Sequence, residues 1–233
     1  MPVSALINRR PERIAVFLGP SCARERAREC LAADYFPPAC RGDLRAAVQQ
    51  GYGTIVLIDG YIVTRYSPSP QEVSDVLSAG AAVFGAASVG ALRAVELRTL
   101  GMVGVGWVYG EFLSGRLDRD DELVSTMDPD NGHRPISIPL VRIRYAATSL
   151  IARGRITATT GATLIDRLSA DYFARRTASR VLSHAREIGI DAETAHELLS
   201  PVFDVKALDT MACLRAADLA RDSSLASSGI AGR

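Results

Sequence analysis

Three short apolar runs set the pattern of the first half of the chain. They cover residues 14–18, 54–58 and 81–86. Short runs that are apolar throughout are typical of strands buried on both faces of a sheet. Each run is followed by a turn and then by a stretch with helical periodicity, which predicts the order βαβαβα. Because parallel strands need crossover connections of this kind, we expect a short parallel sheet with crossover helices.

Helical periodicity, with apolar residues three and four positions apart, accounts for most of the remaining chain. Two helices are expected between the first two strands, and Pro37 and Pro38 separate them because proline interrupts a helix. These two helices are expected at residues 22–31 and 43–50. Beyond residue 138, helices are expected at 140–153, 157–173, 175–188, 192–199 and 203–220.

This change of pattern predicts the domain organisation. We expect an α/β core over residues 1–138 and a helical region over residues 139–222 that packs on the core. Residues 223–233 are small and polar, and we expect a disordered tail there. The predicted fold class is therefore α/β, with a parallel sheet in the first half of the chain and helices in the second.

Composition argues against several kinds of partner. The formal net charge is +1 with acids and bases interspersed, so no basic stripe for nucleic acid is expected. No stretch approaches the ~20 apolar residues that span a bilayer, and the first residues lack the apolar core of a signal peptide. The four cysteines form no CxxC pair and have no histidine nearby in sequence, so we expect neither a metal site nor disulfides. These features indicate a cytoplasmic protein.

Lys206 is the one lysine of the chain, and arginine supplies every other basic side chain. An arginine guanidinium keeps its proton at neutral pH, whereas a desolvated lysine amine can release its proton. The predicted helical stripe of Lys206 also carries Val202, Asp209 and Cys213, which is too apolar for a fully solvated surface. Lys206 is therefore a candidate base. The alternative is that an arginine-rich composition left one lysine by chance.

Ser88 lies on a turn between the third predicted strand and the following helix. Its small neighbours permit a sharp turn, similar to a nucleophile elbow in which Ala86 replaces the first glycine. The Ser88 hydroxyl is a candidate nucleophile, and the N–H groups of Val89 and Gly90 are candidate oxyanion donors. The alternative is that Ser88 is an ordinary N-cap residue.

The turns after the first two strands carry further candidates, since ligands of parallel sheets bind at the carboxyl ends of the strands. Gly19 and Ser21 follow the first strand and are expected to bind substrate, with Ser21 as the second candidate nucleophile. Asp59 follows the second strand and either binds a donor or orients a base, or satisfies turn amides. Arg93, one helical turn from Glu96, either faces an anion or forms an internal ion pair.

No histidine occupies a comparable turn, because His133, His184 and His196 all lie later in the chain. A Ser-His-Asp triad is therefore disfavoured. A serine nucleophile needs a base, and a Ser-Lys pair of Ser88 and Lys206 is chemically coherent if the helix of Lys206 docks over the sheet.

Five segments resemble, in chain order, those of the TfuA-like family. They are FLGPS, PPACRGDL, IDGYI, GAASVGALRAVELRTLGMVGVGWVYGEF and DRDDEL. The resemblance extends from residue 16 to about residue 124, and residues 206–209 are similar to the lysine segment near the C-terminus of the family.

The resemblance implies a partner of YcaO-type enzymes, which activate peptide backbone amides with ATP and install thioamides on ribosomally made peptides. The implied activity is hydrolysis of the C-terminal thiocarboxylate of a ThiS-like sulfur carrier protein, by a serine and a lysine and without a cofactor. The released hydrosulfide would serve YcaO, and the precursor peptide would be an indirect partner. The alternative is a noncatalytic adaptor that docks on YcaO and enhances binding of the precursor peptide.

Overall fold

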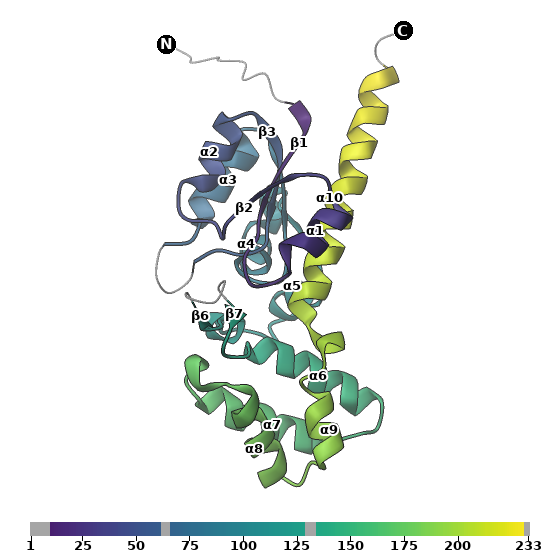
Figure 1. Cartoon of the computed structure of the whole chain (residues 1–233). Coiled ribbons are helices and arrows are strands. Elements are labelled where there is room, and N and C mark those ends of the chain that lie inside the picture. Colours follow the sequence, from purple (N-terminus) through teal and green to yellow (C-terminus); the bar gives the residue numbers. More distant parts are fainter. Residues whose placement is uncertain (1–9, 62–65, 129–133, 231–233) are drawn as a thin grey trace. The chain divides into compact units, whose positions relative to one another are not determined.

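The computed structural model describes residues 10–61, 66–128 and 134–230 (Figure 1). Residue contacts divide the chain into two compact units. The first consists of Met1–Leu117 together with Lys206–Arg233, and the second is Asp118–Val205.

The strands of the first unit form one parallel sheet, and its expected crossover helices are present. The strands are β1 (Arg10–Phe17), β2 (Asp34–Phe36), β3 (Tyr52–Leu57), β4 (Ala82–Gly85) and β5 (Val103–Gly104). Their order across the sheet is β2-β1-β3-β4-β5, and every neighbouring pair is parallel. The predicted α/β fold class is confirmed. In this order the chain reverses its direction of winding between β1 and β3, which is where parallel sheets bind ligands.

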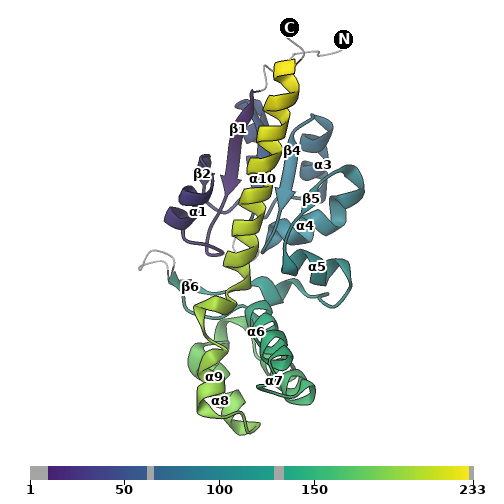
Figure 2. The ribbon, with the colours of Figure 1, turned by 90° about the vertical axis from the view of Figure 1, so that its right-hand side faces the viewer.

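Helices cover both faces of the sheet because its side chains alternate between the faces. Ile14 and Val16 of β1 pack on one side, together with α1 (Arg24–Cys30) and α10 (Val205–Ile230). Figure 2 shows α10 running along this face.

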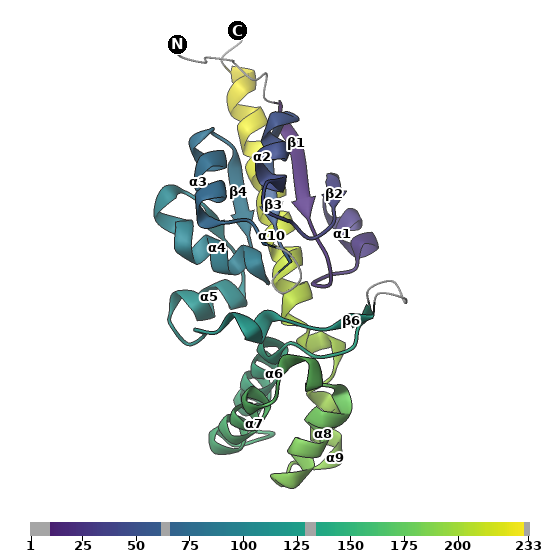
Figure 3. The same cartoon turned by 90° about the vertical axis from the view of Figure 1, so that its left-hand side faces the viewer.

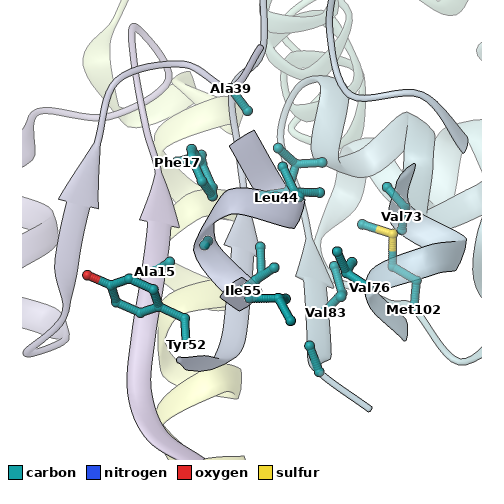
Figure 4. Packing of buried hydrophobic residues seen from close by; sticks show 14 of the residues in the cluster. Ala15, Phe17, Ala39, Leu44, Tyr52, Ile55, Val73, Val76, Val83 and Met102 are labelled. Atoms are coloured by element: carbon teal, nitrogen blue, oxygen red, sulfur yellow. The ribbon is translucent and has the colours of Figure 1, made fainter. Parts of the chain in front are cut away.

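The opposite face is covered by three other helices (Figure 3). They are α2 (Asp43–Gln49), α3 (Pro70–Ser78) and α4 (Val89–Leu97). Phe17 of β1 and Ile55 of β3 pack with Leu44 of α2 in this part of the core (Figure 4). A short helix, α5 (Trp107–Leu113), completes the first unit. The sheet is therefore enclosed on two sides, and its carboxyl edge is available for a site.

The position of α10 differs from the predicted domain boundaries. The sequence predicts the core to end at residue 138, whereas the first unit ends at Leu117 and regains the chain from Lys206 onward. Ala207, Cys213 and Leu214 of α10 bury their side chains against the sheet of the first unit. The backbone of α10 is helical to Ile230, beyond residue 223, where the sequence predicts a disordered tail.

The second unit is mainly helical, as expected. Its helices are α6 (Leu140–Ala152), α7 (Ala158–Ala170), α8 (Ala178–Glu187) and α9 (Ala192–Glu197). It also contains a two-stranded antiparallel ladder of β6 (Met127–Asp128) and β7 (Arg134–Pro135). The described residues of both units also form short 3₁₀ turns, η1 (Arg98–Leu100), η2 (Asp120–Leu123), η3 (Phe173–Arg175) and η4 (Pro201–Phe203).

The acidic segment DRDDEL serves the packing of this second unit. Glu122 is buried and forms a two-pronged ion pair with Arg144, with N–O distances of 2.5 and 2.8 Å. Arg176 is 1% exposed and donates to the Asp121 carboxylate at 2.7 Å and to its carbonyl at 3.1 Å. Because a buried charge is costly without a partner, each of these pairs depends on both of its members. The motif is thus explained by internal ion pairs.

None of the helices in the described part of the chain combines the length and the apolar character that a membrane span requires.

Candidate functional site

Asp59 ties together the two turns at the centre of the carboxyl edge of the sheet. It follows β3, and its carboxylate accepts hydrogen bonds from the turn that follows β1. The donors are the Gly19 N–H at 2.8 Å, the Ser21 N–H at 3.1 Å and the Ser21 hydroxyl at 2.6 Å. Asp59 and Ser21 are each 2% exposed. Of the two interpretations of Asp59, satisfaction of turn amides is therefore observed, and Gly19 and Ser21 are its donors.

Lys206 joins this cluster from the first turn of α10. Its Nζ lies 3.9 Å from Oδ1 of Asp59. The residue is 4% exposed, so the burial expected from the sequence is present. A buried amine is costly without a partner, and the Asp59 carboxylate lies within ion-pair distance of Lys206.

Ser88 occupies the N-cap position of α4, but its side chain does not cap the helix. The preceding residue, Ala87, has φ +64°, which side chains other than glycine seldom adopt. The Ser88 N–H donates back to the Ala86 carbonyl at 2.7 Å, which makes the turn a γ-turn. The Ser88 residue is 3% exposed, and among the described residues no partner hydrogen-bonds to its hydroxyl. Strained turns of this kind are concentrated at functional sites.

The two amides proposed as oxyanion donors differ in the structure. The Gly90 N–H donates to the Ile58 carbonyl at 3.2 Å, so this group is already occupied. The Gly90 N–H reaches the Ile58 carbonyl because α4 begins directly against the end of β3. In the described part of the chain, the Val89 N–H donates to no backbone carbonyl. The Val89 N–H is therefore the better candidate for an oxyanion donor.

Arg93 is held within the protein. Its Nε donates to the Pro68 carbonyl at 2.7 Å, and its Nη1 lies 2.7 Å from Oε2 of Glu96. The internal ion pair expected as one of two alternatives is therefore present, and Arg93 anchors the loop before α3 to α4.

The turn of Ser88 and the first turn of α10 share one part of the core. Ala86 and Ala87, next to Ser88, belong to the same buried cluster as Ala207, which follows Lys206. The helix that carries Lys206 therefore docks on the unit that carries Ser88. Direct contacts join Ser21, Asp59 and Lys206, whereas Ser88 enters the same region through its neighbours.

Asp209, one turn after Lys206, is a buried group whose role the sequence did not suggest. Its carboxylate accepts the N–H groups of Trp107 and Val108, both at 2.8 Å, and so caps α5. Burial raises the pKa of Asp209 to about 6, although the two N–H groups act in the opposite direction. Gly106, with φ +99°, makes room for this contact, since a Cβ there would lie 2.2 Å from the Asp209 carboxyl carbon.

Asp209→Asn is expected to change how stability depends on pH. Because the pKa of Asp209 is higher in the folded than in the unfolded protein, its contribution is fully present below pH 3.8 and is lost as the pH rises through about 6. Relative to Asp209→Asn, the wild type should lose about 2 to 3 kcal/mol of unfolding free energy across this range. Urea denaturation of both proteins at a series of pH values measures this difference, and a constant difference would contradict the assignment.

The histidines lie away from this cluster in the chain. His184 and His196 belong to the second unit, where His184 Nε2 lies 2.9 Å from Asp171 and His196 Nδ1 lies 2.7 Å from the Ala192 carbonyl. His133 falls outside the described residues. Within the described ranges, no group of three His, Cys, Asp or Glu side chains is arranged to hold a metal ion.

Comparison with protein families gives one match. A family model described as TfuA-like protein matches residues 59–177, a little over half of the chain. The matched segment begins at Asp59 and contains Ser88, whereas Ser21 and Lys206 lie outside it. No curated protein matches the chain.

Proposed function

Since the chain belongs to the TfuA-like family, whose members are associated with accessory roles in thioamidation, we propose that it supplies sulfur for this modification. The substrate is the C-terminal thiocarboxylate of a ThiS-like sulfur carrier protein. The product is hydrosulfide, which a YcaO-type enzyme uses on a ribosomally made precursor peptide. One observation carries the proposal: a buried lysine amine, 3.9 Å from a buried carboxylate, lies where parallel sheets bind ligands.

In the first step, Ser88 Oγ attacks the carbonyl carbon of the thiocarboxylate. A C–O bond forms, the C–S bond breaks, and the serine proton moves to the sulfur, which leaves as HS⁻. The carrier is then an ester of Ser88. The support for Ser88 is its position on the strained turn before α4 and a hydroxyl without a hydrogen-bond partner among the described residues.

Lys206 carries the proton in this step. Its ammonium ion gives a proton to sulfur as the C–S bond breaks and takes the serine proton in its place as the C–O bond forms. Asp59 is the partner of the ammonium ion before and after this exchange, and the Asp59 carboxylate accepts hydrogen bonds from Gly19 and Ser21. Expulsion of unprotonated sulfide would be far less favourable, so the leaving group needs this proton.

In the second step, water hydrolyses the ester, which releases the carrier carboxylate and a proton and restores Ser88. The Val89 N–H, at the start of the nine-residue helix α4, stabilises the negative charge that develops on the carbonyl oxygen in both steps. Ser21 and Gly19 position Asp59, and Arg93 holds α4 through its contacts with Pro68 and Glu96.

The purified chain should release sulfide from a thiocarboxylated ThiS-like carrier with no YcaO enzyme present. Ser88→Ala should lower the rate by about a thousandfold or more, because the variant has no nucleophile. Ser21→Ala keeps that nucleophile and should cause a smaller loss. Methylene blue detection of sulfide measures all three rates.

Two outcomes would change the assignment. If Ser21→Ala is the inactive variant and Ser88→Ala retains its rate, Ser21 is the nucleophile. If the wild type releases no sulfide but lowers the Kd between a YcaO enzyme and its precursor peptide, the chain is a noncatalytic adaptor.

A further inference from the structure

A pocket of about 380 Å³ opens beside the cluster of Ser21, Asp59 and Lys206. None of these three residues lines the pocket. Its walls come from the ends of β1 and β2, the β2–α2 loop, α2 and the turn after β3. The residues used below are Phe17, Phe36, Pro38, Asp43, Ala46 and Tyr61. This volume is within the range of pockets that bind small molecules or single anchoring side chains.

The pocket and the cluster share the same turns. Tyr61 lies two residues after Asp59, and its N–H donates to the Ala39 carbonyl at 3.2 Å. The Ala39 N–H in turn donates to the Asp59 carbonyl at 2.9 Å. Pro38 lies directly against Gly19, where a Cβ would come within 2.4 Å of the proline ring. A ligand in the pocket therefore adjoins the turns that hold Asp59.

The pocket favours an uncharged, apolar ligand. Phe17, Phe36, Pro38 and Tyr61 supply rings, and the first two are stacked with a centroid distance of 5.4 Å. Asp43 is the one charged side chain among the described residues of the wall, so a carboxylate or thiocarboxylate is repelled.

The polar side chains of the described wall are those of Cys40, Asp43, Tyr61 and the exposed Gln50. The backbone N–H groups of Ala39 and Tyr61 are used within the turns, and Asp43 accepts the Cys40 N–H at 2.7 Å. Small-molecule sites combine an apolar wall with several directed polar groups, whereas anchoring pockets at protein interfaces take one aromatic or aliphatic side chain.

We infer that this pocket holds a bulky apolar side chain of the polypeptide whose C-terminal thiocarboxylate is hydrolysed. This inference rests on the proposed function. The anchor binds on the α2 face of the sheet, and the chain that follows it crosses the carboxyl edge towards Asp59 and Ser88. The pocket excludes the anionic terminus, which is left for the reactive cluster. An anchor of this kind selects a protein substrate over a free thiocarboxylate.

Ala46→Phe tests the inference because it fills the pocket from α2 without removing a side chain that makes a hydrogen bond. The matched control is Gln49→Phe, which adds the same ring to an exposed position of α2 outside the pocket wall. The probe is a ThiS-like carrier protein in its carboxylate form, titrated by calorimetry. Ala46→Phe should raise the Kd at least about tenfold, whereas Gln49→Phe should leave it unchanged.

A second measurement uses thioacetate, a thiocarboxylate with no polypeptide to anchor. Ala46→Phe should hydrolyse thioacetate at the wild-type rate, which also shows that the variant is folded, while its KM for the thiocarboxylated carrier rises. Equal Kd values for the two variants, or no binding of the carrier by the wild type, would overturn the pocket assignment. Loss of binding in Ala46→Phe alone, combined with no sulfide release by any protein, would leave the pocket in place and refute the hydrolase.

Discussion

Lys206→Met is expected to abolish sulfide release and to destabilise the fold. The substitution removes the proton carrier, and general acid-base catalysis contributes about 10² to 10⁴ in rate. It also leaves the Asp59 carboxylate, which is 2% exposed, without its cation. Removal of one member of a buried pair costs about 3 to 5 kcal/mol. We expect the lower end, because three hydrogen bonds to Asp59 remain. Sulfide assays and urea denaturation measure the two effects.

Two further variants distinguish the effect of the Lys206 charge on stability from the role of Lys206 in proton transfer. Asp59→Asn combined with Lys206→Met removes both charges, so the double variant should be more stable than Lys206→Met and equally inactive. Lys206→Arg keeps a cation beside Asp59, but the arginine guanidinium does not release its proton at neutral pH. It should therefore be more stable than Lys206→Met and still release no sulfide. Sulfide release by Lys206→Arg near the wild-type rate would remove the lysine from the mechanism.

The long buried strands could be predicted from the sequence, but the edges of the sheet could not. The cores of β1, β3 and β4 are apolar throughout because helices cover both faces. The edge strands give no such signal: β2 has three half-buried or exposed residues, and β5 has only two residues. The order of the strands depends on contacts between distant segments, which periodicity does not report.

The sequence also does not show which part of the protein α10 packs against. Its helical pattern was evident, but periodicity does not show which core a helix packs against. Ala207, Cys213 and Leu214 fill the face of the sheet beside α1, and this packing returns the helix to the first unit. The predicted boundary at residue 138 followed the change of local pattern, whereas the units follow tertiary contacts.

The sequence singles out Ser21, Asp59 and Lys206, but it does not show that Asp59 and Lys206 are in contact. Lys206 stands out as the only lysine and is paired with Ser88 by its chemistry, whereas Asp59 stands out as an acid after a buried strand, with no partner assigned to it. Their contact follows from a physical requirement, because a buried cation and a buried carboxylate are stable only with a partner. A search for two isolated buried charges of opposite sign would have suggested the pair.

Gly90→Ala is expected to destabilise the fold strongly. A Cβ on Gly90 would lie 1.7 Å from the Leu57 carbonyl oxygen, and real Cβ atoms do not approach backbone so closely. Gly85, on β4, is similarly close to α4, since a Cβ on Gly85 would lie 2.2 Å from the Gly90 carbonyl oxygen. These glycines allow α4 to begin against β3 and β4. The added methyl group would force the helix away from the sheet and displace Ser88, which precedes α4.

We expect Gly90→Ala to lower the free energy of unfolding by about 3 kcal/mol or more, as for an overpacked core, and to reduce sulfide release with it. The matched control is Gly110→Ala in α5, where a Cβ meets nothing within 4 Å. There, the higher helix propensity of alanine should raise the free energy of unfolding by up to about 1 kcal/mol. Urea denaturation of both variants measures the contrast. Equal stability of Gly90→Ala and Gly110→Ala would show that α4 does not depend on backbone contact with β3, and the strained turn of Ser88 would then need another explanation.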